Sequence, residues 1–280
     1  MHRTIVITGC SSGIGAALAL EFYRRGQTVF ATARRPETLA PLAAQGLRTL
    51  VIDVDDDASI AAAAAAIASE GGQVDILINN AGFSQVGAVI DLSRDDLRRQ
   101  YETNVIAPVA VTRAFLPLLR TAAARNGRAI VANVGSIVGL FATPFAGAYC
   151  SSKAAIHSLS DALRMELAPF AIRVVCIQPG GVRSSFGNHA EKALRLPPGS
   201  LYLPVADGVR ARAQAGQKGA TPTEEFVRPV VDALLAASPP TVVRGGTNSV
   251  KLPLLKKLLP TAMFDARLSR VFGLDRLGKG

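Results

Sequence analysis

The sequence contains few cysteines, no tryptophan and no long apolar run. Its three cysteines, Cys10, Cys150 and Cys176, lack the paired spacing of zinc sites and cannot form a disulfide framework. We therefore predict no metal site and a reducing, cytoplasmic location. No run approaches the roughly 18 consecutive apolar residues of a membrane span, and no leader precedes the apolar run that begins at Thr4, so we expect neither a transmembrane helix nor a signal peptide.

The net charge of +10 raises the question of a nucleic-acid partner. Clustering is missing, however, because the basic residues come singly or in pairs such as Arg24-Arg25 and Arg98-Arg99. Aromatic residues make up only 5% of the chain, which leaves little for base stacking. We expect no nucleic-acid partner, and an anionic cofactor or general solubility accounts for the positive charge more simply.

Short apolar, β-branched runs alternate with longer helical patterns through most of the chain. With 280 residues, 49% of them hydrophobic, one large domain is expected. The alternation predicts an α/β fold, a three-layer doubly wound (Rossmann-type) sheet of about seven parallel strands. The predicted strands are 4–8, 28–32, 49–54, 74–79, 128–134, 173–178 and 241–244, and the predicted helices are 14–25, 37–45, 57–70, 94–123, 148–169 and 224–237.

Two segments depart from this alternation. Residues 181–223 are mixed polar with Pro and Gly, and their length favours a substrate lid over a surface elaboration with a short helix. Residues 251–280 hold seven Lys or Arg against two Asp, interleaved with leucine. We predict a dinucleotide-binding and catalytic domain over 1–250 with a lid at 181–223. The basic amphipathic C-terminal extension, 251–280, would pack on the domain, on a partner subunit or on a membrane surface.

A glycine-rich turn follows the first predicted strand and precedes a helical pattern. Residues 8–15 read TGCSSGIG, with the spacing TGxxxGxG. Glycines let the backbone approach a pyrophosphate, and a helix N-terminus offers unpaired N–H groups to the anion. The turn therefore predicts dinucleotide binding, with contacts from Gly9, Ser11, Ser12, Gly13, Ile14 and Gly15.

The residues after the second strand indicate which dinucleotide binds. A 2′-hydroxyl favours an acidic partner there, and a 2′-phosphate favours arginine. The chain has Arg34 and Arg35 at this place, and no carboxylate before Glu37. We predict NADP(H) over NAD(H), with the alternative that the two arginines only solvate a loop. Further predicted cofactor contacts are Asp53 and Val54 at the adenine, and Asn80, Ala81 and Gly82 beside the adenosine ribose.

Four polar residues form a candidate catalytic set. Tyr149 and Lys153 are four residues apart on a predicted helix, so they lie on one face, and a nearby ammonium makes a phenol more acidic. Ser136 follows the fifth predicted strand, where its hydroxyl could hold a substrate carbonyl. Asn104 could anchor a water beside Lys153. Without its context, a YxxxK spacing is common.

The combined motifs resemble the short-chain dehydrogenase/reductase family over residues 1–250. TGxxxGxG, NNAG, Asn104, Ser136, YxxxK and a Pro-Gly pair follow one another in the family's order. The resemblance implies that Tyr149 is the general acid/base, that Lys153 lowers its pKa and binds the nicotinamide ribose, that Ser136 orients the carbonyl and that Asn104 supports a proton relay. It also implies nicotinamide contacts from Pro179, Gly180, Val182 and Ser184. Gly135 stands where the family often has a second serine.

The resemblance extends to a branch and to an activity. TGCSSGIG with ATARRPE is similar to 17β-hydroxysteroid and retinol dehydrogenases. This implies an NADP(H)-dependent oxidoreductase, such as a carbonyl reductase, that interconverts a lipophilic ketone or aldehyde and its alcohol in a homodimer or homotetramer. The alternative is a non-catalytic NADP(H)-binding regulatory or membrane-recruited protein on the same fold. Phe141, Phe145, Phe186, Leu201, Tyr202 and Leu203 suggest an apolar pocket.

Overall fold

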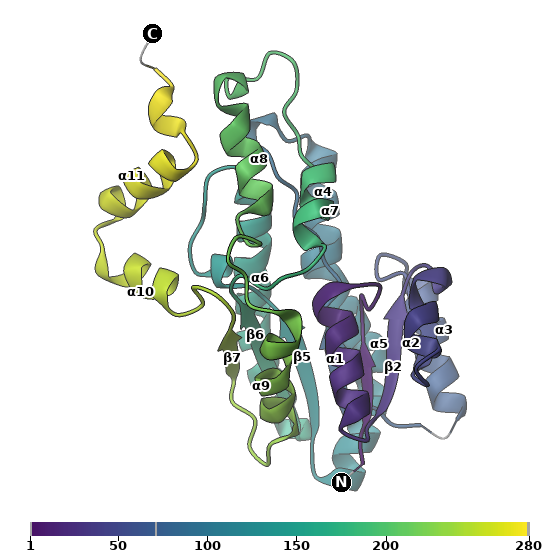
Figure 1. The fold of residues 1–280 in the computed structure, drawn as a ribbon. Coiled ribbons are helices and arrows are strands. Elements are labelled where there is room, and N and C mark those ends of the chain that lie inside the picture. Colours follow the sequence, from purple (N-terminus) through teal and green to yellow (C-terminus); the bar gives the residue numbers. More distant parts are fainter. Residues whose placement is uncertain (1, 71, 279–280) are drawn as a thin grey trace.

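A computed structural model describes residues 2–70 and 72–278 and contains one parallel sheet of seven strands (Figure 1). The strand order is β3-β2-β1-β4-β5-β6-β7, with the chain reversing direction across the sheet after β3. The predicted doubly wound fold is therefore confirmed. The strands are β1 (Thr4–Ile7), β2 (Thr28–Ala33), β3 (Arg48–Val51), β4 (Ile76–Asn79), β5 (Ala129–Val134), β6 (Ile172–Pro179) and β7 (Val242–Gly245).

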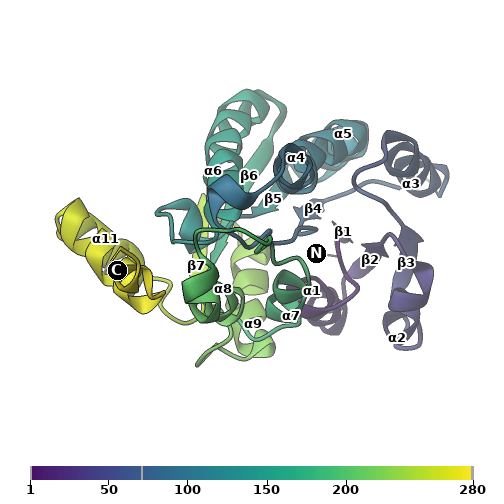
Figure 2. The ribbon, with the colours of Figure 1, turned by 90° about the horizontal axis from the view of Figure 1, so that it is seen from above.

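Helices cover both faces of the sheet. Seen from above, α1 (Gly13–Arg24), α2 (Ala40–Ala43) and α9 (Thr223–Leu235) lie on one side (Figure 2). The other side carries α3 (Asp57–Ser69), α5 (Ala107–Asn126) and α6 (Gly147–Leu167). Every residue of the central strands β4 and β5 is buried, because both of their faces are packed, and a separate apolar core fills each side.

The predicted helix over 94–123 is interrupted. The chain forms α4 (Arg94–Tyr101), a π-helical turn at Glu102–Ile106 and then α5. By length and composition the continuous stretch Arg94–Asn126 could cross a membrane, a property that the sequence analysis did not find. Half of the most apolar 18 residues of this stretch are buried within the protein, as in the core helix of a globular domain.

The segment 181–223 folds over the carboxyl ends of the strands. It contains α7 (Phe186–Lys192) and α8 (Ala206–Gln214), which lie side by side above the sheet in Figure 1. The C-terminal extension forms α10 (Lys251–Leu258) and α11 (Thr261–Val271) at one side of the molecule. Phe264 of α11 is buried against Phe141, at 5.6 Å between ring centroids, so the extension is fastened to the domain there.

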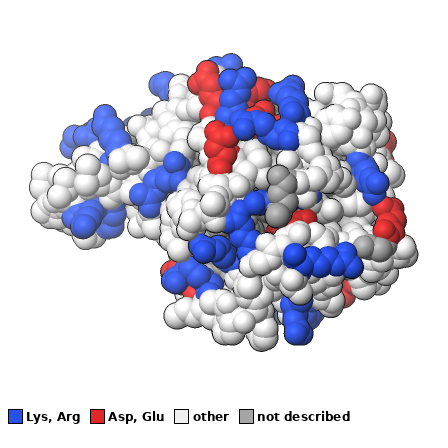
Figure 3. Space-filling view, turned by 90° about the horizontal axis from the view of Figure 1, so that it is seen from below, with Lys and Arg blue, Asp and Glu red and all other residues white. Residues whose placement is uncertain are grey.

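Positive charge is spread over the surface rather than concentrated. Figure 3 shows Lys and Arg in separate groups over the face seen from below, including several on the C-terminal extension at the left. Red carboxylates interrupt the groups nearest the middle. This face offers no continuous basic track of the kind that follows a nucleic-acid backbone.

Candidate active site

The glycine turn has the geometry that a pyrophosphate requires. Gly9 and Gly13 have φ of 73° and 60°, and a Cβ on Gly9 would lie 2.7 Å from Cα of Ala81. Ser12 precedes α1 without a side-chain cap, which leaves the first amides of the helix available to an anion. Residues 9–15 therefore fit the diphosphate of a dinucleotide.

Thr8 and Asn80 hold this turn against the end of β4. The Asn80 side chain donates to the carbonyls of Thr8 and Gly9 at 2.9 and 3.1 Å. The Thr8 hydroxyl accepts from the amides of Asn80 and Ala81, both at 3.0 Å. The side chain of Asn80 thus shapes the turn, and the contact of residues 80–82 with the adenosine ribose remains a prediction. Sequence reasoning missed Thr8, although it opens the TGxxxGxG motif.

The two predicted phosphate-binding arginines have different surroundings. Both are exposed directly after β2, and Arg35 forms a 3.8 Å ion pair with Glu37. Arg34 has no ion pair of this kind within the described residues, although it lies near Asp55. Asp53 and Val54 lie just beyond β3 and are half-buried, and the Asp53 carboxylate accepts from the amide of Asp55 at 3.2 Å. Arg34 is therefore the freer of the two for a phosphate.

The loop after β6 meets the glycine turn. Pro179 ends β6, and Val182 is buried. Ser184 lies so close to Gly13 that a Cβ on that glycine would be 3.1 Å from the Cβ of Ser184. Ser12 and Ser185 share a hydroxyl hydrogen bond of 2.8 Å. The structure thus brings the predicted pyrophosphate and nicotinamide loops together.

Tyr149 and Lys153 lie one turn apart on α6, as the sequence predicts. The Lys153 ammonium is 5.8 Å from the centroid of the Tyr149 ring and donates to the carbonyl of Val134 at 2.7 Å. Burial lowers the pKa of Lys153 to about 8. This buried lysine has spare donors, since an ammonium carries three N–H groups.

The π-helical turn places Asn104 beside this pair. Asn104 is buried, donates to Ser152 at 3.1 Å and accepts from the amide of Phe83 at 3.1 Å. A Cβ on Gly82 would touch both Asn104 Oδ1 and Lys153 Nζ, at 3.0 and 3.8 Å, so the two side chains flank Gly82. Single π turns often occur at functional sites. The water relay predicted for Asn104 remains a prediction.

His157, on α6, contacts the backbone of Ser136. The amide of Ser136 donates to His157 Nε2 at 3.4 Å, and its hydroxyl donates to the carbonyl of Pro179 at 3.4 Å. Burial and the charge of Lys153 lower the pKa of His157 to about 4, so the imidazole is neutral and can accept. Any side chain on Gly135 would collide with the His157 ring, which explains the missing second serine.

Comparison with known proteins agrees with this geometry. The family model described as short chain dehydrogenase matches residues 3–194. The chain belongs to the short-chain dehydrogenase/reductase family. A short-chain dehydrogenase/reductase from Pestalotiopsis microspora is 36% identical over 279 residues, covering 98% of this chain and 95% of the relative. The chain is thus an oxidoreductase of this family.

Solved structures of three similar dehydrogenases share the fold over most of the chain. One from Streptomyces avermitilis has a TM-score of 0.78 and 30% identity, covering 100% of this chain and 99% of its own. One from Burkholderia phymatum, in complex with NAD, has a TM-score of 0.72, 25% identity and coverage of 83% and 85%. A serine dehydrogenase complexed with NADP+ has a TM-score of 0.73, 26% identity and coverage of 87% and 94%. These neighbours support a nicotinamide cofactor.

The phenol of Tyr149 is less acidic than the sequence analysis expects. Burial raises its pKa to about 12, while the hydroxyl of Ser136 and the charge of Arg212 act in the opposite direction. Lys153, with a pKa of about 8, has already lost its proton at the pH where this phenol titrates, so it does not offset the rise there. The predicted tuning of Tyr149 by Lys153 remains a prediction for the cofactor-bound enzyme.

The apolar residues predicted to line a pocket lie in different places. Phe186 packs on the Tyr149 ring at 5.6 Å, and Phe145 packs edge-on against Tyr202 at 5.5 Å. Leu201 and Leu203 are exposed. Phe141 packs on Phe264 in a separate cluster. Of these six residues, Phe186 is the one with a ring contact to Tyr149, and the apolar pocket remains a prediction.

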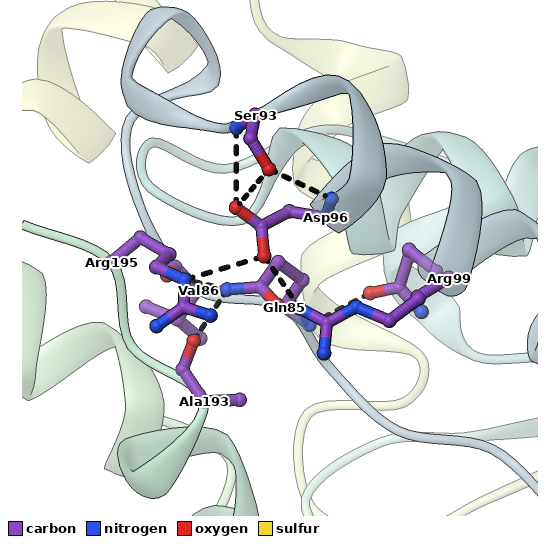
Figure 4. Close-up of polar contacts among 8 residues, drawn as sticks. Gln85, Val86, Ser93, Asp96, Arg99, Ala193 and Arg195 are labelled. Carbon is purple, nitrogen blue, oxygen red and sulfur yellow. Dashed lines mark hydrogen bonds and ion pairs between the residues drawn. The ribbon is translucent and has the colours of Figure 1, made fainter.

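Asp96 anchors the lid segment of this dehydrogenase to α4 (Figure 4). Its carboxylate receives hydrogen bonds from Ser93 at 2.8 Å, from Arg99 at 2.6 Å and from Arg195 of the lid at 3.3 Å. The amide of Arg195 donates to Val86, and Gln85 donates to the Ala193 carbonyl. Burial opposes ionisation, but these donors bring the pKa of Asp96 to about 2.

We expect Asp96→Asn to lower the free energy of unfolding by about 2 kcal/mol, because it leaves two arginines without a carboxylate. Limited proteolysis should then cut within 181–223 faster, since the lid loses this anchor. The pKa of Asp96 is lowered on folding, so its stabilisation is full above about pH 4 and is lost as pH falls towards 2. Asp95→Asn is the control, because Asp95 pairs with Arg98 on the surface. Equal cutting of the two variants would contradict the anchor.

Proposed function

We propose that the protein is an NADP(H)-dependent oxidoreductase that interconverts a lipophilic ketone or aldehyde and its alcohol. One observation carries this proposal: Tyr149, Lys153, Ser136 and Asn104 lie at the carboxyl ends of the strands, beside a glycine turn that fits a diphosphate. A regulator that only binds nucleotides needs none of these four side chains. The narrower resemblance to 17β-hydroxysteroid and retinol dehydrogenases remains a prediction.

In the proposed reaction the chain's own residues handle the substrate oxygen. When bound, the nicotinamide supplies or accepts the hydride. Tyr149 donates its phenolic proton to the carbonyl oxygen as that oxygen becomes a hydroxyl, and Ser136 holds the same oxygen. Lys153 supplies positive charge beside the phenol. Asn104 accepts from the amide of Phe83 and donates to its carbonyl, which fixes the Asn104 side chain beside Lys153.

A spectrophotometric screen tests the activity. NADPH consumption is followed with a panel of apolar ketones and aldehydes, and the Ser136→Ala variant is measured in parallel to exclude a contaminating reductase. The proposal expects turnover that the variant lowers strongly. A lack of turnover with every carbonyl, together with tight binding of NADPH, would favour the non-catalytic regulator.

The cofactor preference is predicted from Arg34. We expect Arg34→Ala to raise the KM for NADPH about ten- to a hundredfold, because a charge-assisted contact to the 2′-phosphate is lost. The KM for NADH should change little. The control is Arg35→Ala, since Arg35 already pairs with Glu37. If Arg34→Ala raises the KM for NADPH and for NADH equally, Arg34 does not contact the 2′-phosphate and only solvates its loop. Similar proteins solved with NAD and with NADP+ make this comparison necessary.

We also propose a homodimer or homotetramer in the cytoplasm. Relatives in this family typically associate, and the exposed Ile106 and Met165 offer apolar contacts at the helices that carry Asn104 and Tyr149. Alternatively, the C-terminal extension contacts a membrane, because its Leu254 and Leu258 are exposed. Light scattering tests the assembly, and vesicle sedimentation of the full chain beside one ending at residue 249 tests the alternative.

A further inference from the structure

Arg212 is a buried cation on the inner face of α8. It is only 9% exposed and shares this face with Val209 and Ala213. These two residues belong to an apolar cluster that includes Phe145 and Val86. Arginine is rarely this buried unless it pairs with an acid or donates to several hydrogen-bond acceptors, because removing its charge from water is costly.

The protein uses only part of the donor capacity of Arg212. Its Nε donates to the Thr143 hydroxyl at 2.7 Å. Within residues 2–70 and 72–278, no carboxylate forms an ion pair with the guanidinium, and its two terminal nitrogens have no hydrogen-bond partner. The acids of α8 and α7 are engaged elsewhere: Asp207 pairs with Arg276, and Glu191 accepts from Gln214. A guanidinium has five N–H donors, so most of them remain for another molecule.

The guanidinium lies near the stretch of α6 that carries the catalytic tyrosine. Thr143, which holds Nε, is 3.8 Å from the sulfur of Cys150, the residue next to Tyr149. Burial raises the pKa of Tyr149, and the charge of Arg212 acts against that rise, which places the cation within electrostatic reach of the phenol. Phe186 of the lid covers the same ring.

The C-terminal extension fixes the helix that carries Arg212. The backbone carbonyl of Phe272 packs directly on Gly208, where a side chain would not fit. Arg276 holds Asp207 at 2.7 Å. Arg212 is therefore presented by a braced helix rather than by a loose loop, as a specificity site requires.

We propose that Arg212 binds a carboxylate of the substrate, so that the substrates are apolar oxo acids and the corresponding hydroxy acids. The inference rests on the proposed oxidoreductase function and narrows it. The planar guanidinium matches a carboxylate in a two-point contact, and the surrounding apolar residues accommodate a hydrocarbon chain. In the reduction, the carbonyl carbon gains the hydride of NADPH and the oxygen gains the Tyr149 proton, while the carboxylate is only held.

The first test compares straight-chain oxo acids with their methyl esters. We expect the wild type to have a KM about ten- to a hundredfold lower for the acid than for the ester. Arg212→Gln should raise the KM for the acid by this factor and leave the KM for the ester unchanged. Thr143→Val should give a smaller rise for the acid, because it removes only the acceptor that orients Nε. Arg210→Gln is the matched control, since Arg210 lies on the exposed side of the same helix.

The outcomes separate this inference from the proposed function. A wild type that reduces no carbonyl contradicts the proposed function itself. A wild type with the same KM for the methyl ester as for the acid keeps the proposed function and overturns the carboxylate site. If Arg212→Gln lowers kcat equally for acid and ester and shifts the pH profile, the arginine acts on Tyr149 alone, which also overturns the inference.

A binding measurement does not depend on turnover. Octanoate should raise the Tm of the NADP+-loaded wild type, and 1-octanol at the same concentration should raise it much less. Arg212→Gln should remove this difference, and Arg210→Gln should preserve it. An equal effect of octanoate on Arg212→Gln and on the wild type would overturn the site, provided that circular dichroism shows the variant to be folded.

Discussion

Tyr149→Phe is expected to lower the kcat of carbonyl reduction by about 10²- to 10⁴-fold, the usual contribution of a positioned proton donor. The change removes one hydroxyl from a ring that packs on Phe186, so the lid contact and the fold should be kept. Binding of NADPH should be retained, because the glycine turn and Arg34 lie outside the change. Steady-state kinetics and fluorescence titration with NADPH measure the two effects.

The direction of the pH dependence follows from the raised pKa of this phenol. Reduction uses the protonated phenol, which is the dominant form below its pKa of about 12. Oxidation of the alcohol uses the phenolate, so its rate should rise with pH over the range in which the phenol is mostly protonated. Tyr149→Phe should flatten this rise. If Tyr149→Phe retained most of the wild-type rate, or the same rise of the oxidation rate with pH, Tyr149 would not be the proton donor.

A nearby tyrosine provides the control. Tyr202→Phe removes a hydroxyl from the lid residue that packs on Phe145, and it leaves the ring contact in place. We expect it to change kcat far less than Tyr149→Phe does. The comparison separates the loss of a reacting hydroxyl from a general disturbance of the apolar cover.

The fold was predictable because each strand carries its own signal. Strands buried on both faces are mostly apolar, and β4 and β5 were found at nearly the predicted bounds. The predicted helix over 37–45 was less accurate, since the chain forms a 3-10 turn at Pro36–Leu39 and only four residues of α2. The π turn at Glu102–Ile106 has no periodic signature in the sequence, because it adds a single residue to a helix that otherwise continues.

The catalytic set was predictable only in part. Tyr149 and Lys153 lie four residues apart on one helix, so their proximity can be predicted from the sequence. The position of Ser136 directly after a predicted strand places it at the same end of the sheet. Arg212 was missed because its partner, Thr143, is 69 residues away, and nothing in the lid sequence tells a buried arginine from an exposed one such as Arg210. His157 was likewise not singled out, because its contact with the Ser136 amide joins residues that are 21 positions apart.

Lys153→Met should lower kcat by about 10²- to 10³-fold, the usual cost of removing one preorganised electrostatic donor. The methionine keeps the apolar stem and removes the ammonium that lies beside Tyr149. The wild-type rate of reduction should fall above about pH 8 as the ammonium loses its proton. The rate of the variant should not show this fall. Lys251→Met, at an exposed position in α10, is the control for charge and should behave as the wild type.

Stability measurements distinguish this electrostatic role of Lys153 from a loss of folding. The pKa of Lys153 falls from 10.5 to about 8 on folding, so between these values the unfolded chain binds a proton that the folded chain lacks. The wild type should therefore gain stability as pH rises from about 8 towards 10, and Lys153→Met should not. Denaturant unfolding at several pH values gives this slope. A variant that lost activity while keeping the wild-type slope would show that another group causes the pH dependence, and Lys153 would then not be the buried ammonium that supports Tyr149.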